Sequence, residues 1–212
     1  MWARSSVTFV SPWCINFRIS DRRSEVFRIA VSLLFAAFPA GAQTVAGDTF
    51  ADRRDGAKLH VASGFVCPAK IGAFERDAVG ESDPQAGVGF CAYGALDGVY
   101  GTIKLIPLHG AYDARQSLDG DFAEQEGTGG TPVAEGNINV AAGGQPLVAY
   151  ARTYETAKLE DLHYRVLFTG AAIGNWAVET TIEFAEPRDV PEELGFLHAV
   201  YASARGEIGK TQ

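Results

Sequence analysis

Apolar and polar positions alternate in the middle of this chain, as they do in β-strands with one face against a core. The runs 88–93 and 99–106 show this pattern, and the turn residues Ala95-Leu96-Asp97-Gly98 separate them. Together they predict a β-hairpin. Two shorter extended segments are expected before it, at 58–66 and 72–77.

Three further strands are expected at 147–154, 164–168 and 176–184. In the last two, apolar residues alternate with polar ones, which predicts one core face and one solvent face. If the chain reverses near Ala172, Val166 lies opposite Val178 in the core. The same register places Arg165 opposite Glu179 in solvent.

A spacing of three and four residues between apolar positions predicts two helices. The segment 111–124 reads as an amphipathic helix weakened by Gly120. A closing helix is expected from Val190 to Ala204, with Asp189 as its cap, Pro191 in its first turn and Glu192 completing a capping box. The apolar positions expected to dock it on a sheet are Leu194, Leu197, Val200 and Tyr201, flanked by Phe196 and Ala204.

The order of these elements predicts the fold class α+β. We expect an antiparallel β-sheet with one inserted helix and a C-terminal helix packed on one face, in a single domain. This order resembles that of PsbP-like secreted domains. The resemblance rests on element order and on no motif, so it assigns no site residues.

The N-terminal part of the chain carries the pattern of an export signal. Arg28 precedes an apolar run of 14 residues, 29–42, which ends in Ala40-Gly41-Ala42. A membrane-spanning helix needs roughly 20 residues. We therefore interpret 26–42 as a signal peptide, 43–212 as the secreted domain, and 1–25 as an extension from a start site assigned too early. A genuine long leader, or a twin-arginine signal at Arg22-Arg23, remains an alternative.

This interpretation predicts a periplasmic or secreted protein with no stable membrane anchor after cleavage. The full chain has 18 Lys and Arg against 26 Asp and Glu, a net charge of −8. Residues 43–212 have 13 against 24, a net of −11, and contain no basic block. Nucleic acid and anionic membranes would repel such a surface, so neither is expected as a partner.

Cys67 and Cys91 are the two cysteines of the predicted secreted domain. In an oxidising compartment they are expected to form a structural disulfide. A redox-active pair is the alternative, although Cys67-Pro68-Ala69-Lys70 lacks the second cysteine of a redox motif.

No motif indicates a cofactor or a metal, so neither is predicted. Gly87-Val88-Gly89-Phe90-Cys91-Ala92 resembles a dinucleotide fingerprint but falls inside an expected strand. The glycines at 127–130 are not followed by the Lys and Ser or Thr of a P-loop, and the acidic residues at 119–126 lack calcium-loop spacing.

The candidate site is the connection after the hairpin, which contains His109, Tyr112, Asp113 and Arg115. An imidazole, a phenol, an anion and a cation fall there within seven residues, beside Gly110. Strand ends and the loops beyond them are where binding sites usually form. The alternative is an ordinary helix start at which Asp113 complements the helix dipole.

Three functions fit these features. The first is a non-catalytic binding or accessory protein of the cell envelope, whose partner is an envelope protein or a small ligand. The second is an exported hydrolase in which Asp113 orients His109. The third is a small carrier with an apolar ligand between the sheet and the closing helix. The sequence specifies no oligomeric state.

Overall fold

The computed structural model of the chain describes residues 48–95, 99–140, 146–156, 164–185 and 190–208. All of them belong to one compact unit, Val45–Gln212. The expected N-terminal extension, the signal peptide and the helix cap Asp189 lie outside the described residues.

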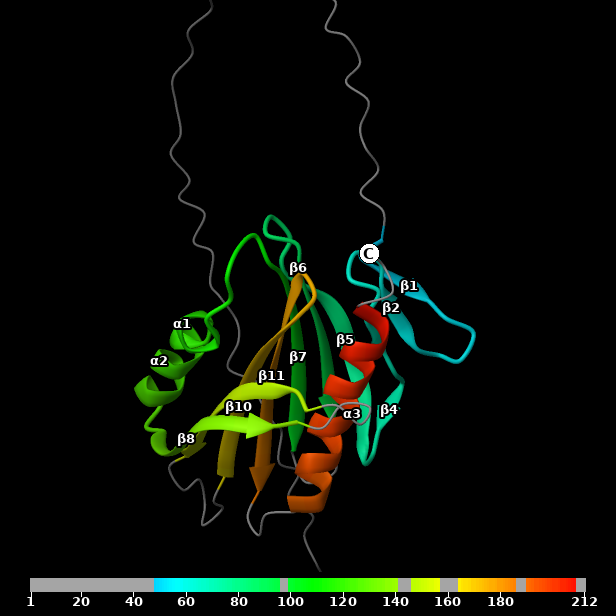
Figure 1. Cartoon of the computed structure of the whole chain (residues 1–212). Coiled ribbons are helices and arrows are strands. Elements are labelled where there is room, and N and C mark those ends of the chain that lie inside the picture. Colours follow the sequence, from blue (N-terminus) through cyan, green and yellow to red (C-terminus); the bar gives the residue numbers. More distant parts are fainter. Residues whose placement is uncertain (1–47, 96–98, 141–145, 157–163, 186–189, 209–212) are drawn as a thin grey trace, which may run out of the picture. The chain divides into compact units, whose positions relative to one another are not determined.

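Eight antiparallel strands form the main sheet, in the order β4-β5-β6-β7-β11-β10-β9-β8 (Figure 1). Their bounds are β4 Lys70–Ile71, β5 Phe74–Asp83, β6 Val88–Gly94, β7 Tyr100–Pro107, β8 Thr131–Asn139, β9 Val148–Glu155, β10 Tyr164–Ile173 and β11 Trp176–Ala185. The predicted hairpin is confirmed as β6 and β7, and the three later strands are β9, β10 and β11. Strand β8 was not predicted, because its residues show no alternation of apolar and polar positions.

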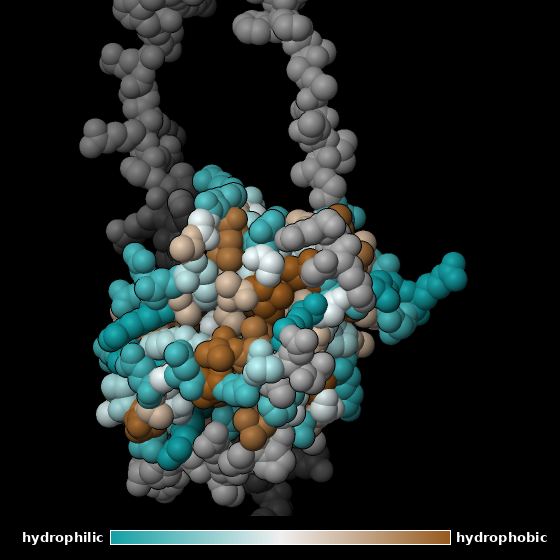
Figure 2. Space-filling model, viewed as in Figure 1, coloured by the Kyte–Doolittle hydropathy of each residue, from teal (hydrophilic) through white to brown (hydrophobic). Residues whose placement is uncertain are grey.

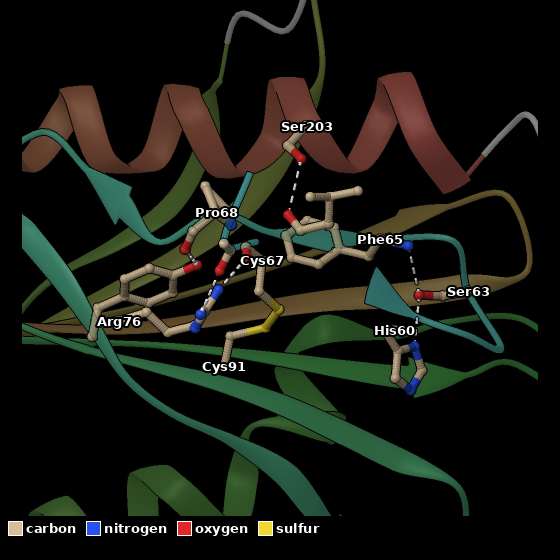
Figure 3. Close-up of a disulfide and its surroundings, with 11 residues drawn as sticks. His60, Ser63, Phe65, Cys67, Pro68, Arg76, Cys91 and Ser203 are labelled. Carbon is tan, nitrogen blue, oxygen red and sulfur yellow. Dashed lines mark hydrogen bonds between the residues drawn. A yellow bond between two sulfur atoms is a disulfide. The ribbon is translucent and has the colours of Figure 1, made fainter. Parts of the chain in front are cut away.

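Three short strands form a second sheet in the order β1-β2-β3. They are β1 Phe50–Asp52, β2 Lys58–His60 and β3 Val66–Cys67. The predicted disulfide is confirmed: Cys67 in β3 is bonded to Cys91 in β6, with 6.3 Å between their Cα atoms, and both residues are fully buried. The disulfide therefore joins the small sheet to the main one (Figure 3).

Arg76 reinforces this junction from strand β5. Its guanidinium donates to the carbonyl oxygen of Cys67 at 2.7 Å (Figure 3). It also donates to the carbonyl oxygen of Gly56 at 2.8 Å. On the other side of β3, the hydroxyl of Ser203 donates to the carbonyl of Val66 at 3.4 Å. Backbone acceptors at the edge of the small sheet are thus satisfied by side chains from the main sheet and the C-terminal helix.

The described residues contain three helices, α1 Ala114–Ser117, α2 Asp119–Gly127 and α3 Val190–Ile208. The prediction of a single inserted helix at 111–124 was wrong, because the segment forms two shorter helices that meet at Leu118. The backbone of Leu118 has φ −88° and ψ 1°, so it ends α1, while its side chain is buried. None of the described helices is long and apolar enough to cross a membrane.

Helix α3 packs on one face of the main sheet, as predicted for the C-terminal helix. It runs one turn beyond the expected end at Ala204, and Ile208 is buried. Leu194, expected in the interface, is instead 41% exposed. The residues of α3 that join the core are Phe196, Leu197, Val200, Tyr201, Ala204 and Ile208.

The predicted register of the last two strands was wrong. The chain reverses through Gly174 and Asn175, so Ile173 pairs with Trp176 and Val178 pairs with Ala171, five residues from Val166. Gly174 has a φ of 58°, the left-handed conformation that such a two-residue turn requires. An odd shift in register exchanges the two faces of a strand.

The expectation that one face of β11 meets solvent was also wrong, because α1 and α2 lie over the face opposite α3. A second core cluster forms there, and Glu179 is only 2% exposed. The residues of this cluster are Leu118, Phe122, Tyr154, Val166 and Phe168. In Figure 2 mostly hydrophilic residues cover the outer surface of α1 and α2, and hydrophobic residues show in the middle of the visible face.

Candidate functional site

Asp113 anchors the connection between β7 and α1. Its Oδ1 accepts hydrogen bonds from the backbone N–H groups of Arg115, at 3.0 Å, and Gln116, at 3.2 Å. The backbone of Asp113 is extended, as an N-cap residue requires. The carboxylate therefore works as a helix cap, which is the role that the helix-start alternative expects.

Tyr112 is held by a residue far away in the sequence. Its hydroxyl donates to Oε1 of Glu179 in β11 at 2.9 Å. Burial raises the pKa of the Glu179 carboxyl, and the hydrogen bonds from Ser117 and Tyr112 and the positive charge of Lys104 oppose this rise. The pKa of Tyr112 is raised as well, by burial and then by the Glu179 carboxylate. This hydrogen bond fixes the connection on the sheet.

Gly170 in β10 leaves the space that Tyr112 needs. A Cβ atom at this position would collide with the Tyr112 hydroxyl and lie 3.1 Å from the Cβ of Ala114. The absence of a side chain thus lets the connection approach the sheet backbone closely.

A half-buried ion pair lies beside this contact. Nζ of Lys104 in β7 is 2.9 Å from Oδ1 and 2.8 Å from Oδ2 of Asp121 in α2. About a quarter to a third of each side chain is exposed, at 30% for Lys104 and 26% for Asp121. The pair ties α2 to the central strands.

Tyr112, Asp113 and Arg115 line a shallow surface hollow of about 480 Å³. Strands β8, β9 and β10 complete its wall and floor. The other lining residues are Ala114, Asn137, Val148, Tyr150, Gly170, Ala171 and Ala172. The opening is thus lined by two phenol rings, a guanidinium, an amide and the side chain of Val148, which is 60% exposed. The hollow is open to solvent and offers an incoming group both apolar surface and a few polar partners.

Charged side chains support the wall of the hollow. Arg152 in β9 lies 4.8 Å from the ring centroid of Phe122 and 5.0 Å from that of Tyr154. Its guanidinium pairs with Glu126 at 3.1 Å and with Glu135 at 3.7 Å. Arg152 is only 16% exposed, and its contacts join α2 and β8 to β9.

Arg115, at the rim of the hollow, also pairs with Glu135. One of its guanidinium nitrogens lies 3.6 Å from Oε1 of Glu135 in β8, and its side chain is 67% exposed. An ion pair this exposed contributes little to stability. The guanidinium therefore remains available to an incoming polar group.

His109 lies apart from the other three candidate residues. It is exposed and does not line the hollow. No hydrogen bond joins His109 to Asp113 in the described part of the chain, where the Asp113 carboxylate serves the cap of α1. The structure brings Tyr112, Asp113 and Arg115 together and leaves His109 outside them.

Among the described residues, no group of three or more His, Cys, Asp or Glu side chains is placed to hold a metal ion. No protein-family model matches this chain, and no curated protein matches it by sequence.

Sequence reasoning missed the sheet's contribution to the hollow. Asn137, Val148 and Tyr150 come from the unpredicted strand β8 and its neighbour β9. Glu179 was assigned to the solvent face. No feature of the sequence marks it as buried, because β11 also contains the polar residues Thr180, Thr181 and Glu183.

Proposed function

We propose that this protein is a non-catalytic binding or accessory protein of the cell envelope. Its contact surface is the hollow lined by Tyr112, Asp113 and Arg115, with His109 at the end of the adjoining loop. The observation that carries the proposal is the convergence of this connection with Tyr150 and Asn137 on one opening. The ligand is a small molecule or a segment of an envelope protein with both apolar and polar groups.

The lining supports recognition better than catalysis. The Asp113 carboxylate accepts two backbone hydrogen bonds, and the Glu179 carboxylate accepts one from Tyr112. Neither is thereby arranged to orient His109 as a general base, as the hydrolase alternative requires. Tyrosine and arginine, by contrast, are the residues that most often carry binding energy.

The buried disulfide supports an extracytoplasmic location, because such bonds persist in oxidising compartments. With a signal peptide that ends at Ala42, the exported protein begins at Gln43. Intact-mass measurement of the exported form checks this position, and a mature form that retains Trp13 would contradict it.

Site-specific photo-cross-linking tests the contact surface. A photoreactive phenylalanine analogue replaces Val148, which is 60% exposed and lines the hollow, or Val61, which is 53% exposed and does not line it. In intact cells we expect adducts from position 148 and none from position 61. An adduct with twice the mass of the chain indicates self-association and does not support a contact with a ligand or an envelope protein.

Arg115→Ala and His109→Ala, each introduced into the position-148 variant, provide the second part of the test. Loss of the adduct in the Arg115 variant supports the surface. Equal adducts from both valine positions, or an adduct that survives both substitutions unchanged, would show that the surface is wrong. Turnover of a substrate panel that depends on His109 would favour the hydrolase.

A further inference from the structure

Within the part of the chain that the structure describes, strand β8 lies at an open edge of the main sheet. It is the last strand in the sheet order and pairs there with β9 alone. Eight of its nine residues are exposed, and the ninth, Ile138, is half-buried. An unpaired strand of this length presents a row of backbone donors and acceptors to a further strand.

The hydrogen bonds between β8 and β9 identify the free groups. The N–H of Val140 donates to the carbonyl of Leu147 at 2.8 Å, in register with the pairs of β8 and β9. Hydrogen-bonded pairs alternate along an antiparallel ladder. The residues that point their N–H and C=O groups away from β9 are therefore Glu135, Asn137 and Asn139.

The two edges of the sheet are protected very differently. On the opposite edge, β4 covers only the first two residues of β5, and β5 then carries two bulges and the charged residues Arg76, Asp77, Glu81 and Asp83. Bulges and charges of this kind discourage edge pairing. In β8 the only bulge lies between Pro132 and Ala134, and Glu135 is the only charged residue. Among the described residues, the segment from Ala134 to Asn139 thus carries a single charge and no bulge to discourage pairing.

We propose that this edge pairs with β8 of a second copy of the chain, in antiparallel orientation about a two-fold axis at Asn137. Outward-facing residues must meet outward-facing residues, so Asn137 lies opposite Asn137 of the second copy. Glu135 then lies opposite Asn139 of the second copy. No like charges are opposed, and the two central amides can bond to each other.

A second copy is the occupant because the edge complements itself. Two-fold pairing provides hydrogen-bond partners for the outward-facing backbone N–H and C=O groups of the same three residues on both copies. Contacts of this kind, in which both copies use the same surface, are the commonest in soluble oligomers. Asn137 also lines the hollow. The two hollows therefore meet at the two-fold axis, each beside residues of the other copy. The inference does not depend on which ligand the hollow binds.

Disulfide trapping tests the register. In Asn137→Cys the two new thiols lie on the axis, with Cα atoms about 5.5 Å apart, as hydrogen-bonded antiparallel pairs have and disulfides accept. In Asn139→Cys, the matched control, they lie about 14 Å apart. We expect a covalent dimer on mild oxidation of the first variant and none of the second. Equal cross-linking of both variants would overturn the register.

Sedimentation analysis of the exported protein, at ~100 µM and physiological salt, tests the association itself. We expect a dimer for the wild type, and a folded monomer for Asn137→Asp and for Asn137→Lys, each measured alone. A mixture of the two variants should restore a heterodimer, because Asp and Lys then face each other. A monomeric wild type would overturn the proposal and leave the edge to a segment of another protein. A dimer that persists in both single variants would also overturn it.

Discussion

The hydroxyl of Tyr112 donates a 2.9 Å hydrogen bond to the carboxylate of Glu179, 67 residues further along the chain. This bond joins the connection before α1 to the centre of the main sheet. It also explains why the hollow has a defined rim, since Tyr112 lines the hollow while its hydroxyl is anchored beneath α1.

Replacement of Glu179 by alanine should destabilise the protein substantially. Glu179→Ala removes the carboxylate that accepts the hydrogen bond of the half-buried Tyr112 hydroxyl, and loss of this bond costs about 1–3 kcal/mol. Chemical denaturation at neutral pH measures the loss. The control is Glu124→Ala on the exposed surface of α2, where a change within about 0.5 kcal/mol is expected. Equal effects of the two substitutions on the free energy of unfolding would show that Glu179 lies on the solvent face.

The same carboxyl should make stability depend on pH. Because burial raises the pKa of Glu179, the folded state holds its proton more tightly than the unfolded state. The stability from this group is complete below the unfolded pKa, about 4.5, and declines as pH rises through the folded pKa. Glu179→Gln keeps an acceptor and does not titrate, so it should gain stability relative to the wild type as pH rises from about 4.5 through the folded pKa. A constant difference across this range would contradict the assignment.

Two glycine-to-alanine substitutions should act in opposite directions. Gly170→Ala puts a methyl group against the Tyr112 hydroxyl and should cost about 1–3 kcal/mol, with loss of any ligand bound in the hollow. Gly120→Ala lies in α2, where a Cβ meets nothing within 4 Å, and should stabilise by about 0.5–1 kcal/mol. Thermal melts of the two variants check the signs. Stabilisation by Gly170→Ala would show that Tyr112 does not sit where described.

His60 should make the protein less stable in mild acid. Its ring is fully buried between Phe50 and Trp176, its Nδ1 lies 2.7 Å from the Ser63 hydroxyl, and its Nε2 makes no hydrogen bond in the described part of the chain. Burial lowers the pKa of His60, and the charge of Glu81 opposes this only in part. The stability from this group is complete above the unfolded pKa of about 6.5 and is lost as pH falls through the folded pKa.

Denaturation of His60→Gln between pH 7.5 and pH 5 tests this, because glutamine keeps a partner for Ser63 without titrating. The wild type should lose up to about 1.4 kcal/mol per pH unit more than the variant over part of this range. His198→Gln, at an exposed position of α3, should behave as the wild type does. Parallel pH profiles for all three proteins would contradict the role of His60.

Removal of the disulfide should loosen the small sheet. The double substitution Cys67→Ser and Cys91→Ser should cost about 3 kcal/mol, because the bond closes a loop of 24 residues in the unfolded chain. A free-thiol assay on the unfolded exported protein should read near zero for the wild type. Two titratable thiols would contradict the bond, and hydrogen exchange should show the largest loss of protection in β1–β3.

Local patterns determined much of the fold in advance. Alternation in β6 and β7 predicted the hairpin, because a half-buried strand imposes a period of two. The spacing of apolar residues predicted α3, and two cysteines in a predicted export domain predicted the disulfide. Each of these properties depends on neighbours in the chain or on the compartment.

Only the tertiary structure decided which surfaces are buried and which groups meet. Glu179 is polar and was expected in solvent, yet α1 and Tyr112 cover it. Tyr112 lies 67 residues away in the sequence, so the residues around Glu179 give no sign of this contact. Strand β8 has no alternation because nearly all of it is exposed, so its hydrogen bonds to β9 alone define it. The sequence therefore determined the connection that carries Tyr112, Asp113 and Arg115, whereas sheet register and helix packing decided that these residues share a hollow with Asn137 and Tyr150.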